Sequence, residues 1–123
     1  MAQVLGIGGI FFKTDNIEAT REWYERVLGF SLEDWGGAVF PAANRAYQVW
    51  TPFEADTDYF EPSAAPYMLN LMVDDLDGVL ARAETEGVEP IGRQDDDTFG
   101  KFAWLIDPNG LKLELWEPTA PTS

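Results

Sequence analysis

The chain has 123 residues, and its 22 acidic and 8 basic side chains give a formal net charge of −14. It contains no cysteine and no histidine, which excludes disulfides, zinc ribbons, thiol nucleophiles and imidazole acids, bases or metal ligands. The length predicts one domain, and a hydrophobic fraction of 46% is typical of globular proteins. The charge argues against nucleic acid as a partner; it suits a cationic ligand or serves only to keep the surface soluble.

The start of the chain does not resemble a targeting signal. Residues 1–13 (MAQVLGIGGIFFK) have no basic stretch before their apolar run, and a lysine ends that run. No apolar stretch of the sequence approaches the roughly 20 residues that a membrane-spanning helix needs. We therefore expect a cytoplasmic protein that has no membrane as a partner.

The first half of the chain predicts a strand, a helix and three further strands. Residues 4–12 predict a strand, although three glycines interrupt it. Asn16 suits the N-cap of a helix over 17–28, and Gly29 suits its left-handed C-cap. The shorter strands are expected at 30–34, 37–41 and 46–51.

The second half predicts the same order of elements. Residues 67–73 predict a strand, Asp75 suits the N-cap of the next helix, and Gly87 ends that helix. The sequence Asp107-Pro108-Asn109-Gly110 predicts a turn between the last two strands. The three strands after the helix are expected near 88–92, 100–106 and 111–116.

The two halves correspond to each other residue by residue at several points. Asn16 and Asp75 are the corresponding helix caps, and Trp50 and Trp116 lie near the end of the last predicted strand of each half. Such a repeat predicts two similar units that pack together, because each is too small to bury its own helix. We expect a single α+β domain over residues 1–123, with two tandem βαβββ modules at about 4–52 and 67–117 and a connecting loop at 53–66.

Three motifs resemble a known family. REWYERVLGF, NLMVDDLDGVLARAETEGV and DPNGLKLELWEP are similar, in this order, to the glyoxalase/bleomycin-resistance/dioxygenase superfamily, also called the vicinal oxygen chelate proteins. The resemblance covers nearly the whole chain. It implies that the two modules form an eight-stranded, mixed, incompletely closed barrel around a cleft, with the helices outside, and that the protein is a homodimer.

The resemblance also indicates where a metal would bind. Enzymes of this superfamily hold a divalent metal with four inward side chains, two from each module. The matching positions of this chain are Gly9, Gln48, Met68 and Glu114. Glycine offers no side-chain ligand and a thioether is a poor ligand for hard cations, so we expect a degenerate site with no metal and no cofactor. Carboxylates of the connecting loop, Asp58 or Glu61, are the alternative ligands.

Strand alternation predicts which side chains face the cleft. On the last strand, Leu111, Leu113 and Leu115 would face the helices, and Lys112, Glu114 and Trp116 would face the opposite side. Aromatic residues of the connecting loop would form a lid. The predicted ligand-binding residues are Ile7, Gly9, Phe11, Trp35, Gln48, Trp50, Tyr59, Met68, Asn70, Met72, Glu114 and Trp116. The alternatives are plain core packing for the tryptophans and methionines, and a loop that only packs against the barrel.

Glu114 is the candidate catalytic or anchoring group. A carboxylate among apolar neighbours is costly to bury without a partner, and Lys112 is the expected partner. We predict that the protein binds a small aromatic or apolar molecule, a cationic one included. The alternatives are a lyase, isomerase or dioxygenase that uses Glu114 with an atypical metal site or none, and an interaction domain with a filled cleft. Metal-dependent glyoxalase activity is not expected, because Gly9 and Met68 stand at the histidine positions.

Overall fold

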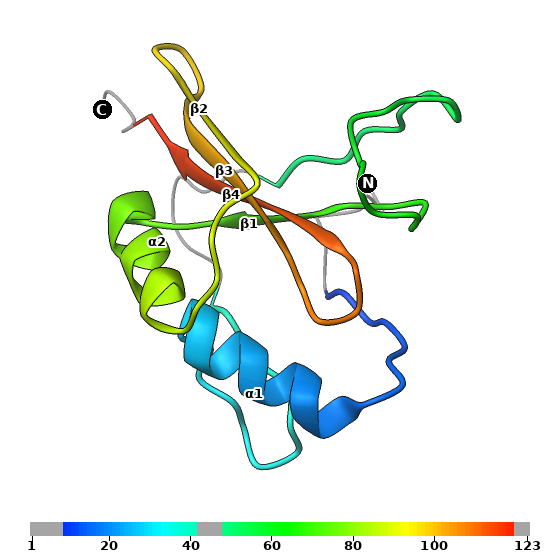
Figure 1. The fold of residues 1–123 in the computed structure, drawn as a ribbon, viewed down its shortest axis with the longest axis vertical. Helices are drawn as coiled ribbons and strands as arrows, with labels where there is room; N and C mark the ends of the chain where they lie inside the picture. The colour runs from blue at the N-terminus through cyan, green and yellow to red at the C-terminus, as the bar shows by residue number, and fades with distance from the viewer. Residues whose placement is uncertain (1–8, 42–47, 120–123) are drawn as a thin grey trace, which may run out of the picture.

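Four strands and two helices form the described part of the chain, residues 9–41 and 48–119 of a computed structural model. The elements are α1 (Ile17–Leu28), β1 (Leu69–Met72), α2 (Leu76–Thr85), β2 (Gly92–Asp96), β3 (Gly100–Ile106) and β4 (Lys112–Pro118). The helices α1 and α2 lie side by side against the sheet, and the segment that leads into β1 extends away from them (Figure 1). Neither helix is long and apolar enough to cross a membrane.

The four strands form one sheet in the order β1-β4-β3-β2. Strand β1 runs parallel to β4, and the other two pairs are antiparallel. This confirms the α+β class and the element order expected after residue 66. The strand expected at 88–92 is wrong in position, since the paired residues are Gly92–Asp96. Val88 still forms part of the segment that directly follows α2, and it packs against the core. Pairing with β3 therefore begins only after Val88.

The helix ends lie where the sequence predicts them. The side chain of Asn16 accepts a hydrogen bond from the Ala19 amide over 2.9 Å, and Gly29 after α1 has a left-handed backbone with a φ of 71°. The side chain of Asp75 accepts from the Gly78 amide over 3.1 Å and caps α2. These caps satisfy backbone groups that a helix end leaves unpaired.

The core lies between the helices and one face of the sheet. Leu105 of β3 and Leu113 and Leu115 of β4 have no exposed surface, and they alternate with side chains of the opposite face. This confirms the alternation predicted for the last strand. The buried apolar residues are Tyr24 and Val27 from α1, Leu76 and Ala83 from α2, and Leu69, Ala103, Leu105, Leu111, Leu113 and Leu115 from the sheet side.

The first half of the chain differs from the sequence-based expectation. In the described residues, 9–12, 30–34, 37–41 and 48–51 form no strand, apart from one isolated bridge between Leu32 and Ala38. The described part therefore forms a four-stranded sheet and not an eight-stranded barrel. A strand needs a neighbour for its backbone groups, and alternation in the sequence does not say which neighbour that is.

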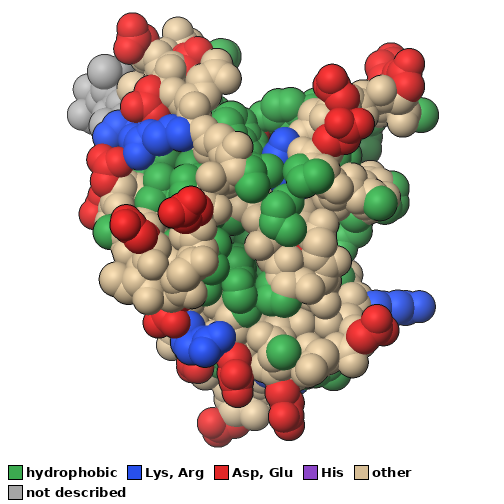
Figure 2. Space-filling view, viewed as in Figure 1, with side chains coloured by type: hydrophobic (Ala, Val, Ile, Leu, Met, Phe, Trp, Pro, Cys, Tyr) green, Lys and Arg blue, Asp and Glu red, His purple; other side chains and the backbone are tan. Residues whose placement is uncertain are grey.

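Large apolar side chains of this half stay exposed as a result. Phe11 is 94% exposed and Trp50 is 80% exposed. Figure 2 shows hydrophobic side chains gathered in a hollow on one face of the molecule, with acidic side chains around the rim. Contiguous apolar surface of this kind marks a place where a protein contacts a ligand or another chain.

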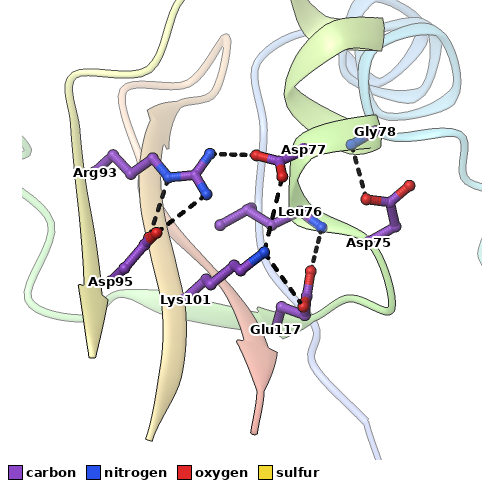
Figure 3. Close-up of polar contacts among 8 residues, drawn as sticks. All are labelled: Asp75, Leu76, Asp77, Gly78, Arg93, Asp95, Lys101 and Glu117. Atoms are coloured by element: carbon purple, nitrogen blue, oxygen red, sulfur yellow. Dashed lines mark hydrogen bonds and ion pairs between the residues drawn. The ribbon is translucent and has the colours of Figure 1, made fainter. Parts of the chain in front are cut away.

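Ionic contacts hold the start of α2 over the sheet (Figure 3). Arg93 of β2 contacts Asp77 of α2 over 2.6 Å, and Lys101 of β3 lies 3.8 Å from Asp77 and 3.9 Å from Glu117. Glu117 of β4 also accepts a hydrogen bond from the Leu76 amide over 2.8 Å. Together these contacts join three neighbouring strands to the first turn of one helix.

Candidate functional site

The sheet face opposite the helices carries a row of aromatic rings. Phe102 of β3 lies nearly parallel to both neighbouring rings, at 6.5 Å and 12° from Trp104 and at 6.1 Å and 4° from Trp116 of β4. We call this surface the aromatic face; its residues are Asn70, Met72, Phe102, Trp104, Lys112, Glu114 and Trp116.

Glu114 lies within the aromatic face, and its residue is only 8% exposed. One carboxylate oxygen accepts a hydrogen bond from the side-chain amide of Asn70 over 2.7 Å. The other accepts from the indole nitrogen of Trp104 over 2.9 Å and from the hydroxyl of Tyr59. Three uncharged donors thus satisfy this buried carboxylate, which would otherwise be costly to bury.

The turn before β4 sets this arrangement. Asp107 accepts hydrogen bonds from the amides of Asn109 and Leu111 over 2.8 and 2.9 Å, and its other oxygen accepts from Tyr24 of α1 over 2.7 Å. These contacts fix the length of the β3–β4 turn, as predicted for the Asp107–Gly110 segment. The turn also fixes the register of β3 and β4, which places Trp104 opposite Glu114.

Lys112 does not form the ion pair with Glu114 that the sequence predicts. Its ammonium group donates to the backbone carbonyl of Tyr59 over 2.6 Å. It also lies 5.1 Å from the ring centre of Tyr59 and 5.6 Å from that of Trp104, within the range of a cation–π contact. The physical reason is that Tyr59 lies over the site and supplies both an acceptor and a ring face to the lysine.

Tyr59 comes from the connecting loop and covers the aromatic face. Its ring stacks on Phe53 at 5.6 Å and 9°, and it meets Trp104 edge-on at 6.3 Å and 89°. Burial raises the pKa of the Tyr59 hydroxyl above its usual range, and the hydrogen bond to Glu114 raises it further. Tyr59 is therefore a neutral hydrogen-bond donor at physiological pH.

A family model decides the identity of the chain. The model of the Glyoxalase/Bleomycin resistance protein/Dioxygenase superfamily matches residues 6–115. The chain belongs to this superfamily. A search of curated proteins finds no match to it.

Solved structures of the superfamily and other proteins have a similar fold. One is TnmS3, described as an antibiotic binding protein from Streptomyces sp. CB03234, at 25% identity over 85% of this chain and 88% of that one, with a TM-score of 0.53. A glyoxalase/bleomycin resistance protein of the same organism matches at 25% identity over 85% and 93%, also with a TM-score of 0.53. A protein from the mobile metagenome of V. Pseudocholerae matches at 17% identity over 96% and 100%, with a TM-score of 0.55, and shows the fold alone.

Some residues predicted for the superfamily's cleft do meet in the structure. Tyr59 and Asn70 both donate to Glu114. Trp116 and Met72 form the next register pair on the same face.

Several other predicted residues make none of the hydrogen bonds to Glu114. Met68 is half-buried just before β1, and Ile7 lies outside the described residues. Gly9, Phe11, Trp35 and Trp50 are exposed and are not among the donors to Glu114, and Gln48 is exposed as well.

Sequence reasoning missed Trp104 and Phe102. Both alternate on β3 with Ala103 and Leu105, which lie in the core. The same alternation argument that was used for the last strand finds them on the opposite face. Their closeness to Glu114 requires the register across the turn as well.

The four positions at which the resemblance predicts a metal, Gly9, Gln48, Met68 and Glu114, offer few ligand atoms. Gly9 has no side chain, Met68 offers only a thioether, and both oxygens of Glu114 already accept hydrogen bonds. Within residues 9–41 and 48–119, no group of three or more His, Cys, Asp or Glu side chains is placed to hold a metal ion.

An open hollow of about 790 Å³ lies elsewhere, at the N-terminal end of α1. Its walls are joined by hydrogen bonds from Thr14 to Asn109 over 2.7 Å and from Asn109 to Thr20 over 3.2 Å. The lining residues are Lys13, Thr14, Asp15, Asn16, Pro108 and Asn109. These contacts join α1 to the β3–β4 turn, so the residues around this hollow have a structural role.

Proposed function

We propose that the protein binds a small aromatic or largely apolar molecule on the aromatic face, beside Glu114. The observation that carries this proposal is a buried carboxylate held by uncharged donors within a row of parallel aromatic rings. Ligand sites in proteins combine apolar and aromatic walls with a few fixed polar groups. The charge of Glu114 makes a cationic ligand suitable, since no cation is hydrogen-bonded to it in the described residues.

The comparison with TnmS3 supports binding in preference to catalysis. That protein is described as binding an antibiotic, and it shares 25% of its residues with this chain over most of both lengths. The likeness supports a small-molecule ligand for this chain.

We propose further that this site works without a metal. The donor set does not fit one, because the N–H and O–H groups that point at Glu114 would repel a cation placed between them. Too few oxygen or nitrogen ligands remain at the other superfamily positions. The superfamily's ordinary metal chemistry is therefore not part of the proposal.

The remaining half of the cleft is proposed to form in a homodimer. Strand β1 is an edge of the sheet, and first-half residues such as Phe11 and Trp50 are exposed. Pairing of these segments with the sheet edge of a second copy would complete the eight-stranded barrel and its two βαβββ modules. A cytoplasmic location remains a prediction from the sequence.

Sedimentation equilibrium tests the dimer. The expected mass is twice the 13.8 kDa of the chain. Phe11→Ser should weaken association, while Ile17→Ser, at an exposed position of α1, should not. A wild-type protein that stays monomeric at micromolar concentrations would contradict this proposal.

The alternative is an enzyme that uses Glu114 as a base. Tyr59 favours it, because a neutral hydroxyl bonded to a buried carboxylate is a possible pair for proton transfer. Incubation of a bound ligand with the protein separates the two functions. Binding alone returns the ligand unchanged, and catalysis returns a product.

Binding is tested by titration followed through tryptophan fluorescence. We use 9-aminoacridine as a cationic aromatic probe and acridine as a neutral one, and we expect both to bind saturably. Glu114→Gln should weaken the cationic probe roughly tenfold or more, because a charge-assisted hydrogen bond is lost. Acridine should be affected less.

Glu117→Gln is the matched control. It makes the same change of charge on the same strand, but Glu117 contacts α2 and not the aromatic face. It should leave the affinity for both probes unchanged. Absence of saturable binding by either probe would overturn the proposed function.

A further inference from the structure

Tyr59 uses the chemistry that a ligand of this site would use. Its hydroxyl donates to Glu114, and its ring meets Trp104 edge-on. Tyr59 therefore combines an aromatic ring, which packs against an aromatic wall, with a hydroxyl that donates to a carboxylate. No other residue of the connecting loop donates to Glu114 in the part of the chain that the structure describes.

The attachment of Tyr59 to the sheet is local. Two hydrogen bonds tie it there, one from its hydroxyl to Glu114 and one from Lys112 to its carbonyl. The described segment from 48 to 68 contains no helix or strand. Tyr59 itself is 37% exposed, and its stacking partner Phe53 is 46% exposed. Moving this side chain off the face thus leaves the core and the sheet intact.

We infer that Tyr59 is an internal stand-in for the ligand, and that the ligand which replaces it carries a hydrogen-bond donor on an aromatic ring. The inference rests on the proposed function and names the class of molecule that the site accepts: phenols and aromatic amines. The reason is the cost of leaving a buried carboxylate short of a donor. A ligand with a ring hydroxyl restores the bond that Tyr59 gave up, and one without a donor does not.

The arrangement makes Tyr59 a competitor of the ligand. In the wild-type protein a phenol exchanges one hydroxyl bond for another. When Tyr59 lacks its hydroxyl, the unliganded site is less stable, and every ligand that displaces the ring should bind more tightly. Removing the hydroxyl of a residue that merely lined the site would leave the affinities unchanged, and removing the hydroxyl of one that donated to the ligand would lower them.

The test uses 2-naphthol and 2-methoxynaphthalene, which share a ring system and differ in the donor. Fluorescence titration of the wild-type protein should show 2-naphthol binding roughly tenfold more tightly. Tyr59→Phe should increase the affinity for both probes by a similar factor, so that the ratio of the two affinities stays the same. Glu114→Gln should reduce that ratio, because the acceptor loses its charge.

Tyr67→Phe is the matched control, because it removes a tyrosine hydroxyl that is not among the donors to Glu114. It should leave both affinities unchanged. Thermal unfolding of each variant establishes that it is folded. The ratio of the two affinities in the wild-type protein tests the need for a hydrogen-bond donor on the ligand without any substitution.

The outcomes separate the inference from the proposed function. If both probes bind the wild-type protein equally, or if Tyr59→Phe weakens them or leaves them unchanged, the inference is wrong while aromatic binding stands. If neither probe binds any form of the protein, the proposed function fails and the inference fails with it.

Discussion

The indole nitrogen of Trp104 on β3 donates to the carboxylate of Glu114 on β4 over 2.9 Å, and the two residues are direct partners in the sheet register. This contact joins two neighbouring strands on the face that we propose binds the ligand. It also explains how a carboxylate is held among aromatic rings without a cation. Its contribution to stability can be measured separately from ligand binding.

Replacing Trp104 by Phe keeps an aromatic ring and removes the donor. We expect the free energy of unfolding to fall by about 1.5–3 kcal/mol, the range for a hydrogen bond to a charged group. Urea unfolding measures it. Trp116→Phe is the matched control, because the Trp116 indole donates to the uncharged backbone carbonyl of Phe99 over 2.7 Å. It should cost less, about 0.5–1.5 kcal/mol for that bond. Equal losses would show that the charge of Glu114 adds nothing.

Because the hydroxyl of Tyr24 is buried, the free energy of unfolding should decrease at alkaline pH. Burial raises the pKa of Tyr24 above its usual range, and the hydrogen bond to Asp107 raises it further. The folded protein therefore keeps a proton that the unfolded chain loses near pH 10. The stabilisation is complete below about pH 10 and decreases as pH rises above it, by up to about 1.4 kcal/mol per pH unit.

Urea unfolding between pH 8 and 11.5 checks this dependence. The Tyr24→Phe variant should be less stable at pH 8, because Asp107 loses one of its donors, and its stability should decrease less steeply above pH 10. Tyr59→Phe should flatten the profile in the same direction but more weakly, since Tyr59 is more exposed. An identical alkaline slope in Tyr24→Phe and the wild-type protein would contradict the assignment.

Local chemistry made part of the fold predictable from the sequence. The caps at Asn16 and Asp75 and the turn at Asp107–Gly110 depend on residues within a few positions of one another. The division of β4 between core and aromatic face follows from alternation alone. Each of these features needs no knowledge of a distant partner.

Features that depend on distant partners were not predictable in the same way. Strand β2 has the sequence GRQDD, which has no apolar alternation, and it exists because it pairs with β3. Tyr59 reaches Glu114 from a loop 55 residues earlier in the chain. The partner of Lys112 was mistaken for the same reason, since its acceptor is the backbone of that loop.

The ionic contacts at the start of α2 should depend on salt and acid. Arg93 lowers the pKa of Asp77 from its usual value through a hydrogen bond and its charge. The resulting stabilisation is present above the unfolded pKa of 3.8 and is lost as pH falls through the lower folded value. Asp77 is 65% exposed, so the effect is small and screened by salt.

Asp77→Asn tests this contribution. At low ionic strength and pH 7 the variant should unfold at slightly lower urea concentration than the wild-type protein. The difference should disappear in 1 M NaCl, and it should decrease as pH falls below 3.8. A difference that persists in 1 M NaCl would mean that packing, and not charge, is responsible. Asp97→Asn serves as the control for general charge effects, because it lies in the β2–β3 turn.

Gly100 at the start of β3 is a position where the backbone tolerates no side chain. Its φ is 119°, and a Cβ atom there would lie 2.1 Å from the carbonyl oxygen of Glu117 and 2.9 Å from the amide nitrogen of Thr119. Gly100→Ala must therefore strain the backbone and also separate β3 from the end of β4. We expect a loss of about 3 kcal/mol or more in the free energy of unfolding, since strain and steric conflict add.

Gly87→Ala separates the two causes of that loss. Gly87 also has a positive φ, 78°, but a Cβ atom there meets no atom within 4 Å. It should cost only the conformational strain, about 1–2 kcal/mol. Urea unfolding of both variants gives the comparison, and similar losses would mean that β3 and β4 move apart at Gly100 without cost. Because Trp116 donates to Phe99 beside this glycine, Gly100→Ala should also change tryptophan fluorescence, and Gly87→Ala should not.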